Sequence, residues 1–293
     1  MLQGCITALI TPMNNSGDID FDALQDFIEW QIESGVTGLV VNGSTGEAAT
    51  LSEIEKIKLI KFVISKVDKR VAIIVGSGTA STEATLDFVQ KVNNIDGVDY
   101  LMCLTPYYVK PTQEGLYLHF QAVAKSSKYP VILYNVPGRT GCNLDDKTTL
   151  RLAREHANIV GLKDATGDIR RALYLIANKP SHFTLLSGDD ATALAVMLCG
   201  GAGVISVVSN IRPKQYVTMC NLAIAGDTAK ANEINRLLIG LYDLLFVEAN
   251  PIPVKWGLYF EGRIKSAFLR LPLTELSSNY RTRLEECLAE ISG

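Results

Sequence analysis

Residues 131–168 read VILYNVPGRTGCNLDDKTTLRLAREHANIVGLKDATGD, and this stretch decides the fold. It opens with the apolar run VILYN at 131–135, and a second apolar run, IVGLK at 159–163, begins 28 residues after the first. Continuous apolar runs of this length suit strands that are buried on both faces of a parallel sheet. A spacing of about 30 residues is what a strand–helix–strand crossover requires. The stretch therefore predicts one repeat of a parallel α/β fold.

The same repeat continues in both directions along the chain. The predicted strands are 5–10, 36–42, 71–76, 100–104, 131–135, 159–163, 184–187 and 203–208. Helix signals stand between them, such as the capping box formed by Ser52 and Glu55. Eight strands that alternate with helices predict an α/β protein with the (β/α)8 fold, the TIM barrel.

About 80 residues follow the last predicted strand, and their apolar positions are also periodic. Helices are expected at 214–225, 228–247, 251–260 and 280–291. We expect a single catalytic domain over residues 1–293, with the barrel at 1–225 and a C-terminal helical extension at 226–293. The extension is compatible with a subunit interface and equally with a purely structural cap.

Composition excludes several classes of protein. With 28 Lys and Arg against 31 Asp and Glu, the formal charge is −3, which gives no electrostatic reason to expect nucleic acid or an anionic membrane as a partner. No apolar stretch is long enough to span a bilayer, and the N-terminus lacks the basic segment of a signal peptide. Six dispersed cysteines indicate neither a zinc site nor a disulfide framework. We expect a cytoplasmic enzyme.

Active sites of this fold lie at the carboxyl ends of the strands, and Lys163 closes the run IVGLK. An ammonium at the mouth of a barrel is partly desolvated, which favours the neutral, nucleophilic amine. Such a lysine can form a Schiff base with a carbonyl substrate. The alternative is a lysine that reaches out to solvent from a strand end or pairs with Asp164.

Hydroxyl groups and an arginine end the neighbouring strands. Tyr134, Tyr108 and the hydroxyl of Ser44 or Thr45 could carry protons without adding a charge, and the glycines around Ser44 and Thr45 could present backbone N–H groups to a small carboxylate. Arg139 offers a fork suited to a second carboxylate. Taken singly, each has a commoner explanation, namely core packing, a glycine-rich turn or a surface arginine.

Other chemistries have weaker support. His119, His156 and His182 share no predicted strand end, so no metal cluster and no histidine-based triad is expected. The segment 76–78, GSG, lacks the third glycine of a dinucleotide fingerprint. The loop after the seventh strand reads SGDD at 187–190, which argues against a phosphorylated substrate.

Taken together, the motifs resemble those of the dihydrodipicolinate synthase family of pyruvate-dependent class I aldolases. The motifs are GSTGEAATLS at 43–52, TPYY at 105–108, YNVPGRTG at 134–141, GLKDATGD at 161–168, LSGDD at 186–190 and NPIPVKWGL at 250–258. The resemblance implies condensation of pyruvate with L-aspartate 4-semialdehyde to 4-hydroxy-tetrahydrodipicolinate, the first committed step of the diaminopimelate and lysine pathway. It also implies a homotetramer built from tight dimers, and no metal or redox cofactor.

The resemblance also implies roles for single residues. Lys163 would condense with pyruvate, and Tyr134 would relay protons together with Ser44 and with Tyr108 from across a dimer interface. The substrate-binding residues would be Thr45 for the pyruvate carboxylate, Arg139 for the carboxylate of the semialdehyde, and Gly188 and Ile205 lining the pyruvate pocket.

Two departures from the family pattern matter. Family members usually have Thr at the position of Ser44, and the form GSTGE also occurs in the related N-acetylneuraminate lyases. A sister aldolase that cleaves a 2-keto acid is therefore the second hypothesis, although Arg139 favours the synthase because the lyases lack this arginine. A catalytically silent barrel that acts as a sensor or structural subunit is the third.

The second departure concerns feedback by lysine at the dimer interface. Tyr107 of that site is present, but the positions where lysine-sensitive members often carry two histidines, an asparagine and a glutamate are occupied by Glu53, Lys56, Ala80 and Ala84. The ammonium of Lys56 and the missing carboxylate at Ala84 disfavour a cationic effector, while Glu53 could partly offset them. We therefore expect weak or absent inhibition by lysine.

Overall fold

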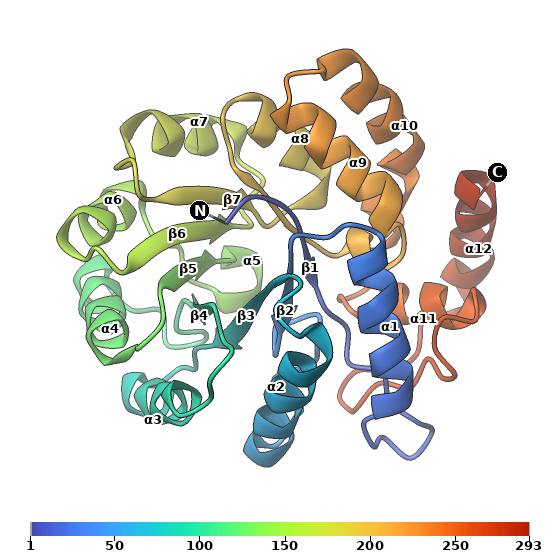
Figure 1. Ribbon diagram of the computed structural model, residues 1–293, viewed down its shortest axis with the longest axis horizontal. Helices are drawn as coiled ribbons and strands as arrows, with labels where there is room; N and C mark the ends of the chain where they lie inside the picture. The colour runs from blue at the N-terminus through green and yellow to red at the C-terminus, as the bar shows by residue number, and fades with distance from the viewer. Residues whose placement is uncertain (1, 293) are drawn as a thin grey trace.

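The computed structural model describes residues 2–292 and closes eight parallel strands into one barrel (Figure 1). Each strand pairs with its neighbours in the sequence, and β1 pairs with β8 to complete the ring. The strands are β1 (Gly4–Ala8), β2 (Gly38–Val41), β3 (Ala72–Ser77), β4 (Tyr100–Leu104), β5 (Val131–Asn135), β6 (Ile159–Asp164), β7 (Thr184–Ser187) and β8 (Gly203–Ser206). The predicted (β/α)8 fold is confirmed.

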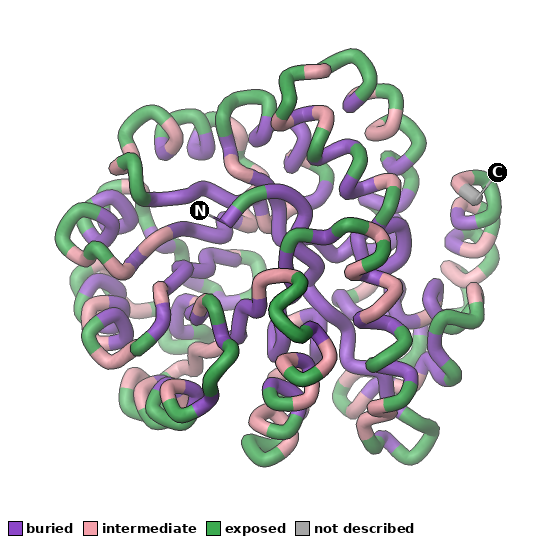
Figure 2. The backbone as a smooth tube through the Cα atoms, viewed as in Figure 1, coloured by how far each residue is buried: buried purple, intermediate pink, exposed green. Residues whose placement is uncertain are grey.

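Helices surround the barrel and bury their inner faces against it (Figures 1 and 2). They are α1 (Phe21–Glu33), α2 (Glu53–Val67), α3 (Thr82–Asn93), α4 (Gln113–Ser126), α6 (Asp146–Glu155), α7 (Ile169–Asn178), α8 (Asp190–Leu198) and α9 (Pro213–Ile224), while the one-turn helix α5 (Pro137–Thr140) lies in the connection from β5 to α6. After them come α10 (Thr228–Leu244), α11 (Ile252–Phe260) and α12 (Ser278–Ser292). Helix α10 packs on α8, α9 and α12, and α11 also packs on α12.

Side chains of the strands alternate between two separate apolar cores, because successive residues of a strand point to opposite faces. The larger core lies between the strands and the helices. The smaller one fills the inside of the barrel with Leu2, Ile6, Ala8, Val40, Ile74, Met102, Ile132, Tyr134, Val136, Leu186 and Ile205. This alternation decides which strand-end residues face the barrel mouth.

The capping box predicted from the sequence is confirmed, whereas the end of the eighth strand differs from the prediction. Ser52 and Glu55 form the capping box of α2, with the backbone N–H of Ser52 donating to Glu55 Oε2 at 2.8 Å. The eighth strand ends at Ser206 instead of residue 208, because the buried Asp190 carboxylate accepts the backbone N–H groups of Val207 and Val208. These two bonds turn the chain into a 3-10 helix, η1 (Val208–Asn210).

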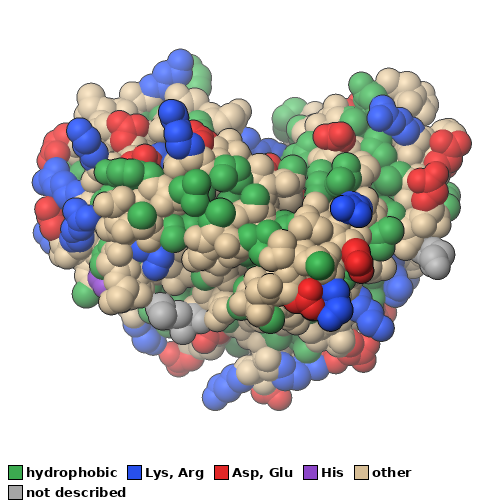
Figure 3. All heavy atoms as spheres, turned by 90° about the horizontal axis from the view of Figure 1, so that it is seen from above, with side chains coloured by type: hydrophobic (Ala, Val, Ile, Leu, Met, Phe, Trp, Pro, Cys, Tyr) green, Lys and Arg blue, Asp and Glu red, His purple; other side chains and the backbone are tan. Residues whose placement is uncertain are grey.

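The surface charge and the helix lengths agree with what the composition indicates. On the face drawn in Figure 3, basic and acidic side chains are interspersed instead of gathered by sign. Such a face does not concentrate the field of one charge. Within residues 2–292, no helix combines the length and the apolar character that crossing a membrane requires.

His119 predicts a pH dependence of stability. It lies between α4, α3 and β4, where Thr82 Oγ1 contacts Nδ1 at 2.9 Å and Cys103 Sγ lies 3.8 Å from Nε2. Burial lowers the pKa of His119 to about 4. Because the pKa is lower in the folded chain than in the unfolded one, stability is full above about pH 6.5 and falls as the pH drops toward 4.

When the pH is lowered from 7 to 5, the shifted pKa of His119 should lower the free energy of unfolding by about 2 kcal/mol. The variant His119→Asn keeps an acceptor for Thr82 but does not titrate, so its stability should change less over this range. Urea denaturation of both proteins at the two pH values measures the difference. Equal losses in the two proteins would contradict the assignment.

Candidate active site

Lys163 lies inside the barrel, at the fifth position of β6. The register of the sheet sets it beside Tyr134 of β5 on one side and Leu186 of β7 on the other. Only 6% of Lys163 is exposed, and its Nζ lies 4.2 Å from the centre of the Tyr134 ring. An aromatic face of this kind attracts an ammonium. The two residues that the sequence placed on neighbouring strand ends are therefore in contact.

Asp164 does not pair with Lys163, because the next residue of the strand points to the other side of the sheet. Its carboxylate accepts hydrogen bonds from Thr166 Oγ1 at 2.5 Å, Asn135 Nδ2 at 3.1 Å and Arg171 Nε at 3.2 Å. The alternative in which Asp164 neutralises Lys163 is wrong. The strand end thus keeps its carboxylate outside and its amine inside the barrel.

Gly188 and Ile205 border the same interior. A Cβ atom added to Gly188 would lie 3.0 Å from both Cγ and Cε of Lys163, so the absence of a side chain there leaves room for the lysine. Ile205 belongs to the apolar cluster inside the barrel, together with Tyr134 and Leu186. Gly188 is therefore next to Lys163, and Ile205 lies inside the barrel.

Thr45 and Arg139 are joined through a residue that the sequence analysis had not singled out. Asn250 Nδ2 donates to Thr45 Oγ1 at 2.9 Å, and Arg139 Nη2 donates to the backbone carbonyl of Asn250, also at 2.9 Å. Thr45 and Asn250 are buried. The half-buried Ser44 precedes Thr45 in a run of turns after β2, in which its carbonyl accepts the N–H of Glu47.

A second buried contact connects the turn after β2 with the segment that follows Asn250. Lys255 of α11 donates to Glu47 Oε1 at 2.7 Å and to the carbonyl of Thr11 at 3.1 Å, and both charged side chains are fully buried. Burial lowers the pKa of Lys255, while Glu47 acts in the opposite direction. Sequence reasoning missed this pair, although one signal was available, namely a lysine inside the apolar stretch IPVKWGL.

Tyr108 is exposed in the single chain, whereas Lys163 is buried. The side chain of Tyr108 is 88% exposed, and its neighbours Tyr107 and Val109 are exposed too. The backbone of Tyr108 has a φ of 74° and its N–H donates to the carbonyl of Thr140. Among residues 2–292, no hydrogen bond joins the Tyr108 hydroxyl to Tyr134 or to either hydroxyl of the 43–47 turn.

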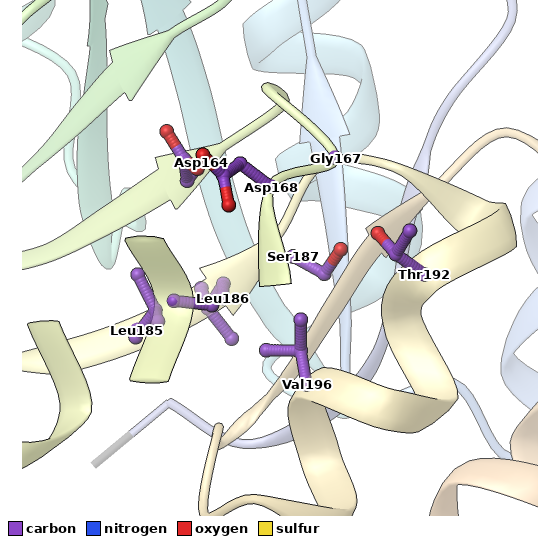
Figure 4. Close-up of a pocket in the computed structure, with 9 residues that line it drawn as sticks. Asp164, Gly167, Asp168, Leu185, Leu186, Ser187, Thr192 and Val196 are labelled. Carbon is purple, nitrogen blue, oxygen red and sulfur yellow. The ribbon is translucent and has the colours of Figure 1, made fainter. Parts of the chain in front are cut away.

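The two acidic residues after β7 accept hydrogen bonds from nearby groups of the chain. Asp189 caps α8 by accepting the N–H and the hydroxyl of Thr192, at 3.0 and 2.6 Å, and Asp190 holds the turn after β8. Burial raises the pKa of Asp190. Beside them, a cavity of about 10 Å³ between β7 and helices α7 and α8 has room for one water at most (Figure 4). Asp189 and Asp190 thus bind groups of the protein itself.

Metal ligands are not clustered in the part of the chain that the structure covers. Within residues 2–292, no group of three or more His, Cys, Asp or Glu side chains is placed to hold a metal ion. The groups that surround the barrel mouth are instead an amine, hydroxyls, an amide and a guanidinium. This set suits carbonyl chemistry on a substrate that carries carboxylates.

Comparison with known proteins gives one consistent result. The family model described as the dihydrodipicolinate synthetase family matches residues 1–291. The 4-hydroxy-tetrahydrodipicolinate synthase of Laribacter hongkongensis is 48% identical over 98% of both chains, and that of Coxiella burnetii is 46% identical over 99% of both.

Solved structures agree with the sequence relatives. The chloride-inhibited dihydrodipicolinate synthase from Acinetobacter baumannii, in complex with pyruvate, superposes with a TM-score of 0.97 at 45% identity and covers 100% of this chain and 99% of its own. The enzyme from Thermotoga maritima also gives 0.97, at 40% identity with the same coverage. With a buried lysine at the end of β6 and full-length relatives at this identity, the chain belongs to the dihydrodipicolinate synthetase family.

Proposed function

We propose that this chain is a lyase that condenses pyruvate with L-aspartate 4-semialdehyde to 4-hydroxy-tetrahydrodipicolinate, at the start of the diaminopimelate and lysine pathway. The observation that carries the proposal is Lys163, buried inside the barrel against Tyr134 in a chain that is 48% identical to a synthase of this name. The protein is expected in the cytoplasm.

In the proposed reaction, the Lys163 amine attacks the keto carbon of pyruvate, and loss of water gives an imine. Loss of a methyl proton turns the imine into an enamine, whose carbon attacks the aldehyde. The amino group of the second substrate then displaces Lys163 as the ring closes. The lysine itself supplies the electron sink, so the proposal needs no metal or redox cofactor.

The surrounding residues would divide the remaining work. Tyr134 contacts the lysine and would move protons to and from the carbinolamine, with Ser44 as a further hydroxyl of the relay. Thr45 would hold the pyruvate carboxylate and Arg139 that of the semialdehyde. Gly188 and Ile205 would shape the pyruvate pocket. The barrel at 1–225 would carry all of these groups, and the extension at 226–293 would support them.

The direct test is turnover of the purified protein with pyruvate and L-aspartate 4-semialdehyde, coupled to the next reductase. Cleavage of N-acetylneuraminate is measured alongside, because Ser44 is shared with that sister lyase. Synthesis without cleavage supports the proposal and the role of Arg139. Cleavage without synthesis would transfer the chain to the sister lyases.

A dimer would complete the site. Tyr108 is exposed in the single chain, and the adjacent Tyr107 and Val109 extend it into an apolar patch of the kind that a second copy covers. We propose that Tyr108 enters the site of the partner subunit, and that two such dimers form a tetramer.

Mixed dimers test this arrangement. Tyr108→Phe and Lys163→Ala subunits should each be nearly inactive alone, because each variant lacks one part of every site. After confirmed mixing, activity should rise to about a quarter of the wild-type value, since half of random dimers are mixed and each contains one intact site. No recovery in confirmed mixed dimers would show that Tyr108 acts within its own chain, and full activity of Tyr108→Phe alone would show that it plays no part.

Inhibition by lysine should be weak or absent. Glu53, the acidic residue at one of these positions, already binds Lys91 Nζ at 2.5 Å. Lys56 stands one helical turn from Glu53 and adds a positive charge to the same surface. Initial rates over a lysine titration measure the effect, and the variant Ala84→Glu should become more sensitive because it restores a carboxylate. Half-inhibition of the unmodified protein at submillimolar lysine would contradict the prediction.

A further inference from the structure

Asn250 contacts both of the residues that are proposed to bind carboxylates, Thr45 and Arg139. Its side-chain Nδ2 donates to Thr45 Oγ1, and its backbone carbonyl accepts from Arg139 Nη2, both at 2.9 Å. The residue is only 5% exposed and directly precedes the segment that begins α11. One residue of the C-terminal segment thus contacts groups that lie after β2 and after β5.

The contact with Thr45 determines what the threonine hydroxyl can do. A hydroxyl has one hydrogen and two acceptor lone pairs, whereas a carboxylate only accepts. Because the Asn250 amide donates to Thr45 Oγ1, the hydroxyl hydrogen is not used in that contact and remains available for another acceptor. The Thr45 hydroxyl, held in this way, can donate a hydrogen bond to an anion.

The position of Asn250 is itself held by a neighbouring contact. Lys255, one turn further along α11, forms the buried ion pair with Glu47, two residues beyond Thr45. The backbone N–H of Arg270 also donates to Glu47, at 3.2 Å. Two side-chain contacts therefore join the 43–47 turn to the start of α11, and the amide of Asn250 has little freedom to move away from the threonine.

We propose that Asn250 is a positioning residue for pyruvate, which aims the Thr45 hydroxyl as a donor at the pyruvate carboxylate. This inference rests on the proposed function, in which Thr45 binds that carboxylate. The side chain of Asn250 acts on the pyruvate end alone, since Arg139 is held by its backbone carbonyl, which a substitution leaves in place. The two substrates should therefore respond differently to the same variant.

The test is the nearly isosteric variant Asn250→Asp, measured with both substrates. An aspartate carboxylate cannot donate, so Thr45 must turn its hydrogen toward residue 250 and away from pyruvate. We expect the KM for pyruvate to rise at least about tenfold, as for loss of a hydrogen bond to a charged group. The KM for the semialdehyde and kcat should change less than about threefold.

A double-mutant cycle with Thr45→Val separates this mechanism from simple repulsion by the new charge. If Asn250 acts through the threonine, Asn250→Asp should have little further effect on the pyruvate KM once the hydroxyl is gone. An equal rise with and without the hydroxyl would overturn the proposal. Asn279→Asp, which adds the same charge to the exposed first turn of α12, is the matched control and should behave as the unmodified protein.

The remaining outcomes separate failure of the positioning role of Asn250 from failure of the proposed role of Thr45. If Thr45→Val raises the pyruvate KM but Asn250→Asp does not, the positioning role fails and the proposed function stands. If Thr45→Val leaves the pyruvate KM unchanged, the proposed role of Thr45 fails, and the role of Asn250 with it. Should Asn250→Asp not fold, Asn250→Ala in the same cycle serves instead, with a smaller expected rise because the hydroxyl can then rotate freely.

Discussion

Replacing Lys163 by alanine will lower the rate of condensation by at least about 1000-fold, because the covalent route through an imine is lost. The same variant will not be trapped by sodium borohydride in the presence of pyruvate. Mass spectrometry of the wild-type protein after this treatment should place one reduced adduct on Lys163. The fold should persist, since a shorter apolar side chain replaces an amine inside the barrel.

Two controls make the result decisive. Lys230→Ala removes an exposed lysine of α10 and should change neither the rate nor the adduct. Lys255 is the other deeply buried lysine, and its ion pair with Glu47 should protect it from pyruvate. An adduct on Lys255, or a wild-type protein left unmodified at Lys163, would contradict the assignment, and the second result would revive the catalytically silent barrel.

Replacing Lys255 by methionine will destabilise the protein by about 3–5 kcal/mol, because it leaves the Glu47 carboxylate buried without its cation. Both side chains of this pair are inaccessible to solvent, so water cannot replace the lost partner. Urea denaturation gives the unfolding free energy of the variant relative to the unmodified chain. Activity should fall too, since the turn that carries Thr45 rests on this pair.

Restoring charge balance should recover much of that loss. In the double variant Glu47→Gln with Lys255→Met, no ionised group is left unpaired, and the glutamine can still accept the N–H of Arg270. Lys128→Met breaks the exposed pair with Asp96 and serves as the matched control, with little expected change. If the double variant were no more stable than Lys255→Met, lost packing instead of the unpaired charge would be the cause.

The strands and the position of Lys163 at a strand end were accessible from sequence alone. A strand buried on both faces is a continuous apolar run, and the repeated spacing of about 30 residues is a local property that needs no knowledge of long-range contacts. Lys163 could be found for the same reason, because the end of a parallel strand is visible as the end of its apolar run. The family resemblance then added chemical roles to positions already singled out.

The partners of these residues could not be found in that way. Asn250 contacts Thr45 across 205 positions of sequence, and Lys255 contacts Glu47 across 208. No periodicity or spacing relates such residues, and only closure of the barrel with α11 laid against the turn after β2 brings them within hydrogen-bond distance. Strand alternation decided that Lys163 faces Tyr134 and that Asp164 does not. The sequence by itself thus determined the barrel and the place of Lys163 at a strand end, whereas the tertiary structure decided which groups lie around it, because hydrogen bonds depend on distance in space.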